Sequence, residues 1–284
     1  MAFVLFLLLM SMRLDGVKHR LASRVSAEIS EKYGLPLEVE ELEIRGLNDV
    51  RLKNVLLLDL KGDTVLHAAG ARAYLQTKRL LEGEVRVNTL VFAAPKVRLS
   101  RATPESELNV QFMVDIINGN KKQEKSRIDL RINQLLVYDG EFSYDVLSMP
   151  LDSTRFNANH ILVTDLACNL SLKKMVGDEV ELFVRSVSGK ERCGLELDRL
   201  RMNFIKVGNT LGVDNMELRT PLSKVTAQRV ELCADSAWNN IALKGCVESG
   251  CFVVDELAPF VGLPQRDLPS MAFRVDGFYS KDSV

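Results

Sequence analysis

The chain has 284 residues, 46% of them hydrophobic and 26% charged, so it is long and apolar enough to bury a core and differs from a disordered tail. Lysine and arginine number 37 against 38 aspartates and glutamates, and the formal net charge of -1 argues against the basic surface that nucleic-acid binders need. Only 6% of the residues are aromatic, whereas valine, leucine and isoleucine are abundant. This composition favours a strand-rich protein with few stacking surfaces for bases.

The N-terminus is apolar up to Met12 apart from one serine, and the first charge is Arg13. This run is shorter than the roughly 20 residues of a complete membrane span, and it lacks the positive start and the cleavage site of a signal peptide. Apolar residues then recur at helical spacing until Gly34. We therefore predict that residues 1–34 form an uncleaved membrane anchor and amphipathic helix whose first residues are missing. The predicted membrane-inserted residues are Phe3, Val4, Leu5, Phe6, Leu7, Leu8 and Leu9. The alternative is the buried N-terminal helix of a soluble protein.

Alternating apolar and polar residues replace the helical period after Leu35. The segments 50–60, 85–93 and 162–172 each place apolar side chains on one phase and polar ones on the other. We predict a mainly β fold with an N-terminal helix, in which strands of about eight to twelve residues form an elongated, curved antiparallel sheet with one apolar face. Residues 35–118 form a first β segment, residues 119–127 a polar loop, and residues 128–284 a continuing β segment that is truncated at its C-terminal end.

Local signals place further elements within this sheet. The Asp139–Gly140 dipeptide between two apolar stretches predicts a hairpin turn. Residues 255–261 predict a short helix, and a new strand is expected to open at Met271.

Motifs for catalysis or metal binding are missing from the sequence. The five cysteines show no C-x-x-C spacing, and the three histidines are isolated from one another. His67 lies in phase with Val65 and Ala69, which is more typical of a core residue than of a ligand. The sequence also lacks the phosphate-binding, dinucleotide-binding and nucleophile-elbow motifs. We therefore predict no catalytic residue, no metal site and no cofactor, and we expect that the protein is not an enzyme.

An ordered series of short segments resembles the N-terminal region of the TamB proteins, which are envelope proteins related to AsmA. The series begins with the apolar anchor, Tyr33–Gly34 and Leu37–Val39, and continues through residues 52–59, 62–66, 130–144, 155–161, 194–197, 255–261 and 275–277. The resemblance implies an inner-membrane protein of diderm bacteria that crosses the membrane once and projects a β-structured groove into the periplasm. It also implies a role in phospholipid transport between membranes and in outer-membrane protein assembly and secretion. The family's C-terminal domain, which meets an outer-membrane barrel partner, is missing from this sequence.

The predicted partners are therefore the inner membrane, phospholipid and, through the missing region, an outer-membrane barrel, with no nucleic acid. An apolar trough would shield acyl chains from water at about 0.8 kcal/mol per buried methylene. Periodicity alone is equally consistent with a closed core against a second layer. Two other functions are weighed: a protein-binding scaffold for β-barrel assembly without lipid carriage, and an anchored envelope enzyme. The residues predicted to line the lipid groove are Val50, Leu52, Leu56, Leu58, Val85, Val87, Ile132, Leu166, Leu170 and Leu172.

Overall fold

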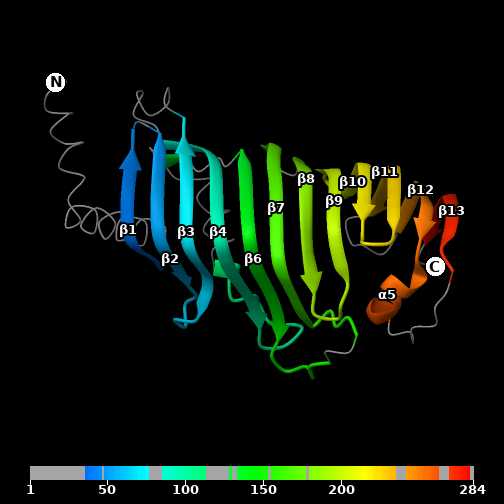
Figure 1. Cartoon of the computed structure of the whole chain (residues 1–284), viewed down its shortest axis with the longest axis horizontal. Coiled ribbons are helices and arrows are strands. Elements are labelled where there is room, and N and C mark those ends of the chain that lie inside the picture. The colour runs from blue at the N-terminus through cyan, green and yellow to red at the C-terminus, as the bar shows by residue number, and fades with distance from the viewer. Residues whose placement is uncertain are drawn as a thin grey trace, which may run out of the picture. The chain divides into compact units, whose positions relative to one another are not determined.

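The structure is a computed structural model, and it describes residues 36–46, 48–76, 85–112, 128–129, 133–152, 155–176, 179–234, 241–261 and 269–281. The predicted anchor, including Phe3 to Leu9, the polar loop 119–127 and the groove candidate Ile132 lie outside the described residues. The described chain is mainly β, as the alternation predicts, and its strands follow one another in chain order (Figure 1).

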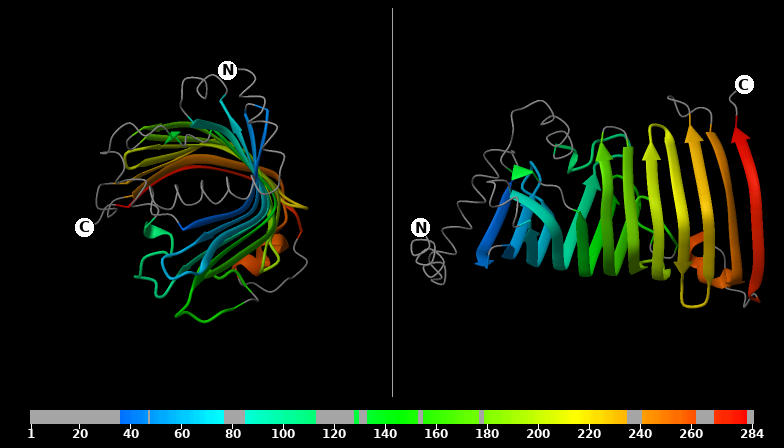
Figure 2. Two further views of the ribbon diagram at one scale, coloured as in Figure 1. Left: turned by 90° about the vertical axis from the view of Figure 1, so that its left-hand side faces the viewer. Right: turned by 90° about the horizontal axis from the view of Figure 1, so that it is seen from above.

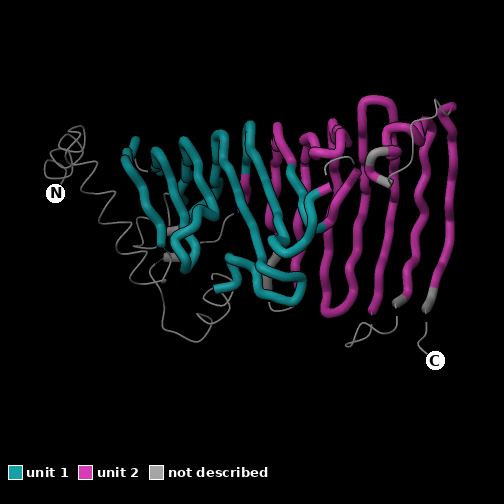
Figure 3. Tube along the Cα trace, turned by 90° about the horizontal axis from the view of Figure 1, so that it is seen from below, with its two compact units in different colours: residues 1–132, 136–151, 159–162 teal, residues 133–135, 152–158, 163–284 magenta. Residues whose placement is uncertain are grey.

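The chain divides into two compact units, coloured separately in Figure 3. Unit 1 comprises residues 1–132, 136–151 and 159–162, and unit 2 comprises residues 133–135, 152–158 and 163–284. The strands that belong wholly or mostly to unit 1 are β1 (Leu37–Arg45), β2 (Asp49–Leu58), β3 (Thr64–Leu75), β4 (Val85–Arg101), β5 (Ile128–Asp129) and β6 (Gln134–Val146). The elements of unit 2 are β7 (His160–Val176), β8 (Glu179–Glu191), β9 (Glu196–Val207), β10 (Thr210–Arg219), β11 (Lys224–Ala234), β12 (Ile241–Phe252), α5 (Val254–Val261) and β13 (Met271–Lys281).

In unit 1, each strand from β1 to β4 pairs antiparallel with the next one. Strands β4 and β6 are also neighbours in the sheet, but they run parallel to each other. The amides of Leu147 and Ser148, just after β6, donate to the carbonyls of Arg101 and Ala102 at the end of β4, at 2.9 and 3.0 Å. These bonds bring the C-terminal ends of two neighbouring strands together, so β4 and β6 run in the same direction. The prediction of a purely antiparallel sheet is therefore wrong at this point. In unit 2, each strand from β7 to β13 pairs antiparallel with the next.

The predicted hairpin at Asp139–Gly140 is also wrong. Strand β6 runs without interruption from Gln134 to Val146, and Asp139 sits within it at a φ of 56°. Aspartate and glycine tolerate this left-handed backbone conformation, which is why the dipeptide is common in tight turns. Here the same tolerance produces a local irregularity inside a continuous strand.

Two strands of unit 1 that flank β3 share such an irregularity, which we call the crease. It consists of Asn54 in β2 and Ala94 in β4, with φ values of 48° and 46°. Both residues lie opposite Ala69 of β3, because the residue pairs before and after them are in unbroken register. Leu52 and Val55 lie on opposite sides of Asn54 and belong to the same apolar cluster. At the crease, the spacing between side chains on one face of β2 is therefore three residues instead of the usual two.

Secondary-structure predictions at the C-terminal end are confirmed. Helix α5 covers residues 254–261 and β13 opens at Met271. The strands are often longer than expected: β4 and β7 each contain 17 residues, and Figure 2 shows long strands bending along their length. Among the described residues, no helix is both long enough and apolar enough to cross a bilayer.

Candidate apolar binding surface

A row of apolar residues crosses the strands of unit 2 on one face of the sheet. Each member is the direct antiparallel partner of the next, and direct partners lie side by side on the same face. We call this the apolar row; from β7 to β13 it consists of Leu172, Leu182, Phe204, Val213, Val230, Gly245 and Gly277. A shorter row of the same character runs beside it, two residues along each strand, and contains Leu211, Leu232, Leu243 and Tyr279.

The opposite face of the same strands is polar. Its corresponding row from β7 to β11 contains Ser171, Phe183, Asn203, Asp214 and Arg229. The Arg229 guanidinium lies 3.8 Å from the Asp214 carboxylate, and the guanidinium of Arg185 lies 5.5 Å from the centre of the Phe183 ring. Unit 2 therefore has an amphipathic sheet, with one face suited to water and the other to apolar matter.

The apolar row ends in a hollow of about 260 Å³ on β11 to β13. Gly245 and Gly277 are direct partners; at Gly245 Val230 fills the space that a side chain would take, with its Cγ2 3.0 Å from an added Cβ, so the open part of the recess lies at Gly277. A Cβ atom built on Gly277 meets no atom within 4 Å. The residues around the hollow are Val230, Leu243, Gly245, Val247, Val275, Gly277, Phe278 and Tyr279.

The apolar walls of this hollow are open to solvent. Leu243 is 41% exposed, Tyr279 59% and Val275 61%. Isolated exposed apolar residues are ordinary, but a contiguous group around a recess marks a binding surface in many soluble proteins. The hollow is smaller than the roughly 300–1,000 Å³ of a typical small-molecule pocket, so it suits part of a larger apolar ligand.

Unit 1 has an apolar face as well, but that face is buried. Val55 and Ala68 are only 4% and 0% exposed, and with Ala71 they form a core cluster against which Leu52 and Phe92 pack. Burying a valine side chain contributes about 1.5–3 kcal/mol, so this cluster stabilises β2 to β4. These apolar side chains of unit 1 therefore form a core. Periodicity alone could not distinguish such a core from an open groove.

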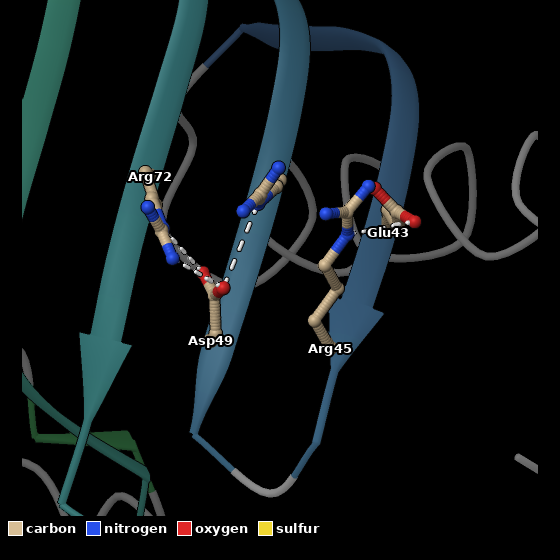
Figure 4. A network of polar contacts seen from close by, with 5 residues as sticks. Glu43, Arg45, Asp49 and Arg72 are labelled. Carbon is tan, nitrogen blue, oxygen red and sulfur yellow. Dashed lines mark hydrogen bonds and ion pairs between the residues drawn. The ribbon is translucent and has the colours of Figure 1, made fainter.

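The other face of unit 1 carries an ion-pair network. Arg72 in β3 donates from Nε and Nη2 to the two carboxylate oxygens of Asp49 in β2, at 2.7 and 2.6 Å (Figure 4). These hydrogen bonds hold the pKa of Asp49 below its ordinary value of 3.8. The Arg72 guanidinium also lies 4.6 Å from the centre of the Tyr74 ring, and Glu43 pairs with Arg45 on β1 at 3.0 Å. The charges satisfy one another, so this face has the character of a solvated outer surface.

The crease divides the groove residues predicted on β2 between the two faces. Val50 and Leu52 pair with Ala73 and Ala71 and lie on the apolar face. Leu56, beyond Asn54, instead lies between Glu38 and exposed His67. The even-numbered residues 50–58 were expected to share one face. This expectation is wrong for Leu56, and also for Leu58, which lies two residues further along the same side of β2. The prediction that His67 is a core residue is wrong for the same reason.

The remaining predicted groove residues lie on β4 and β7. Val87 is buried opposite Leu75, and Val85 opens β4. On β7, Leu172 belongs to the apolar row, Leu170 pairs with buried Val184 beside that row, and Leu166 is half-buried. Among the predicted residues, Leu170 and Leu172 are therefore the ones that share a face with the hollow.

Sequence reasoning missed the part of the surface that is most open. Gly245 and Gly277 are 32 positions apart, and only the β12–β13 register makes them partners. A glycine inside an apolar strand was a usable signal for a recess, because it removes a side chain from a packed surface. The described residues contain no group of three or more histidine, cysteine, aspartate or glutamate side chains arranged to hold a metal. No protein-family model and no curated protein matches the chain.

Proposed function

We propose that the protein is a periplasmic lipid-binding protein of the TamB and AsmA type, anchored in the inner membrane by residues 1–34, which carries phospholipid along the apolar face of a curved, groove-forming sheet. The observation that carries the proposal is the apolar row of unit 2 with its exposed hollow. The ordered sequence resemblance supports it and supplies the location, the barrel partner and the link to outer-membrane protein assembly. Binding in this way requires no catalytic group and no cofactor.

The physical basis is the contrast between the two faces of unit 2. An acyl chain lying along the apolar row would lose contact with water at about 0.8 kcal/mol per methylene, while the charged head group stays outside. A chain crossing several strands, which are about 4.8 Å apart, would contact one apolar side chain at each strand. The polar face, with its paired Asp214 and Arg229, offers no such gain.

Two adjacent residues of β12 provide a test with a built-in control. A photo-crosslinking amino acid at Leu243 lies beside the hollow, whereas one at Lys244 is also exposed to solvent but points to the opposite face. With the full chain in phospholipid vesicles, we expect a lipid adduct from position 243 and little or none from 244. Equal capture at both positions, or none at 243, would refute lipid binding by this surface.

A second candidate function is a scaffold for β-barrel assembly that carries no lipid. It is favoured by β13, which pairs only with β12 among the described strands and exposes Met271, Val275 and Phe278. An unpaired apolar edge of this kind accepts an extended partner strand through backbone hydrogen bonds. A proline at Val275 would impair such pairing, whereas a leucine at Gly277 would impair only ligand binding in the hollow.

A further inference from the structure

The connection that follows β6 exposes a short apolar segment of unit 1, which we call the apolar tip. It consists of residues 147–151, with the sequence Leu-Ser-Met-Pro-Leu, and all five are exposed. Leu147 is 70% exposed, Leu151 60% and Met149 37%. Consecutive apolar residues in contact with water are unfavourable in a folded protein, and they mark a surface that meets another apolar phase.

The apolar tip lies at the edge of unit 1 where β2, β4 and β6 all end. Strands β2 and β4 both pair antiparallel with β3 and so run in one direction, and β6 runs parallel to β4. This is the lower edge in Figure 1. The turn after β2 adds Leu60, which is 74% exposed. Strands β2 and β6 are three steps apart, which is about 14 Å at a spacing of about 4.8 Å. Leu60 therefore extends the apolar character of this edge.

The backbone donors of the apolar tip are already used within unit 1. The amides of residues 146–149 donate in turn to the carbonyls of Asn159, Arg101, Ala102 and Val146, at 2.8, 2.9, 3.0 and 3.0 Å. Pro150 has no amide hydrogen. Buried His160 donates from Nε2 to the Met149 carbonyl at 2.9 Å, and its Nδ1 lies 2.8 Å from the Asp145 carboxylate. A segment can enter hydrocarbon only when its own protein satisfies its backbone groups, and these amides meet that requirement.

The same features favour a bilayer over a protein as the partner. A peptide that adds to a strand binds through free backbone donors and acceptors, whereas the amides of residues 146–149 are occupied. Hot spots of protein interfaces are rich in tryptophan, tyrosine and arginine and poor in leucine, and the apolar tip has none of the first three. The acidic residues on either side, Asp145 and Asp152, lie 2.8 Å from His160 and Arg155, which offsets their repulsion of phosphate groups.

We propose that the apolar tip inserts into the interface of a phospholipid bilayer, with Leu147 and Leu151 in the acyl region and the hydrogen bonds of His160 at its base. This membrane contact is made by unit 1 and is separate from the anchor proposed for residues 1–34. It uses no residue of the apolar row or of the hollow, so it does not depend on lipid carriage by unit 2. Because the tip itself carries no charge, insertion needs no anionic lipid.

The insertion is tested with a polarity-sensitive fluorophore on Ser148→Cys. The full chain, with its five native cysteines replaced by serine, is placed in phosphatidylcholine vesicles. Tyr138→Cys is the matched control, since Tyr138 is 55% exposed on the same strand but lies about 30 Å before the tip at about 3.3 Å per residue. A spin label on the lipid acyl chain should quench emission from position 148, which should also be protected from iodide in the water. Position 138 should show the reverse.

Two further variants test the contribution of the leucines. Leu147→Ala and Leu151→Ala, measured with the fluorophore at position 148, should each lower the ratio of inserted to free tip on the order of tenfold, because most of a leucine side chain no longer leaves water. Both leucines are exposed, so the midpoint of urea unfolding should stay the same. An unchanged ratio in both variants would overturn the proposal.

The remaining outcomes separate the bilayer from other partners and from lipid carriage. Acyl-chain quenching that is equal at positions 148 and 138, or absent at 148, would refute insertion of the tip. Protection from iodide without vesicles would refute it as well, because the tip would then be covered by a second copy of the chain. Photo-capture of lipid at position 243 is measured in the same vesicles. Capture at 243 without quenching at 148 would remove the tip contact and keep lipid carriage, and quenching at 148 without capture at 243 would do the opposite.

Discussion

Ala94→Gly should give a higher free energy of unfolding than Ala93→Gly, the same change one residue earlier. Ala94 has a φ of 46°, and a left-handed backbone costs a residue with a Cβ about 1–2 kcal/mol. Glycine removes this cost but also loses about 0.4–1 kcal/mol, because it makes the unfolded chain more flexible. Ala94→Gly is therefore expected to change the free energy of unfolding by about 0 to +1.5 kcal/mol.

Ala93 offers a matched control, because it is also exposed and pairs with Gly70 in ordinary strand geometry. Ala93→Gly carries the same unfolded-state loss without any relief of strain, so it should destabilise the protein by about 0.5–1 kcal/mol. The unfolded-state contribution cancels in the difference between the two variants, which isolates the conformational cost of about 1–2 kcal/mol.

The assay is equilibrium urea unfolding of the full chain followed by far-ultraviolet circular dichroism, with both variants and the parent measured in one buffer. If Ala93→Gly and Ala94→Gly are destabilised by the same amount, Ala94 does not occupy the left-handed region. The crease would then be absent from β4 and would fail as the explanation of how Phe92 and buried Pro95 come to face the same cluster residues, Ala71 and Ala68.

Three other predictions follow from the two faces and from the hollow. Leu57→Ala should lower the free energy of unfolding by about 2 kcal/mol or more because Leu57 is buried, whereas Leu56→Ala on the outer face should cost much less; equal losses in urea unfolding would refute the switch of faces. Gly277→Leu should fill the hollow, since an added Cβ meets no atom within 4 Å, and weaken binding of a fluorescent fatty acid about tenfold, while Gly250→Leu, where an added Cβ also has open space, should leave the dissociation constant unchanged. Asp49 has a pKa lower in the folded than in the unfolded chain, so its stabilising contribution is present above the unfolded value and is lost as the pH falls through the folded value; Asp49→Asn should therefore be less stable than the parent at pH 7, and in thermal unfolding this difference should shrink as the pH falls through the folded value.

The elements that could be predicted are those with a local signal. Alternation along a strand reports which side chains share a face, so β2, β4 and β7 were recognisable, and the helical period of residues 255–261 identified α5. These signals act over a few residues and do not depend on what the chain meets elsewhere.

The residues with a left-handed backbone inside the strands could not be predicted, because their sequence signal is ambiguous. Asp139–Gly140 favours a left-handed backbone whether the chain reverses or continues, and only pairing with neighbouring strands decides between the two. Asn54 is ambiguous in the same way, and missing it assigned Leu56 to the wrong face. Ala94 has no sequence signal at all, since alanine rarely adopts this conformation.

The sequence predicted an apolar face of the sheet, but it identified only some of the residues that form it. Leu170 and Leu172 lie on the apolar face of unit 2, where alternation put them. The hollow depends on the register between β12 and β13, which brings Gly245 beside Gly277, and register is a property of two strands that neither contains alone.

The most direct test of the lipid-binding surface is a scan with a photo-crosslinking residue on β8, β10 and β11, placing it in turn on each face. Positions 182, 213 and 230 lie in the apolar row, and positions 183, 214 and 229 lie in the polar row on the opposite face. In the full chain expressed in a diderm bacterium, phospholipid should be captured from all three positions of the apolar row and from none of the polar row. Capture that does not alternate between the two rows would contradict the account.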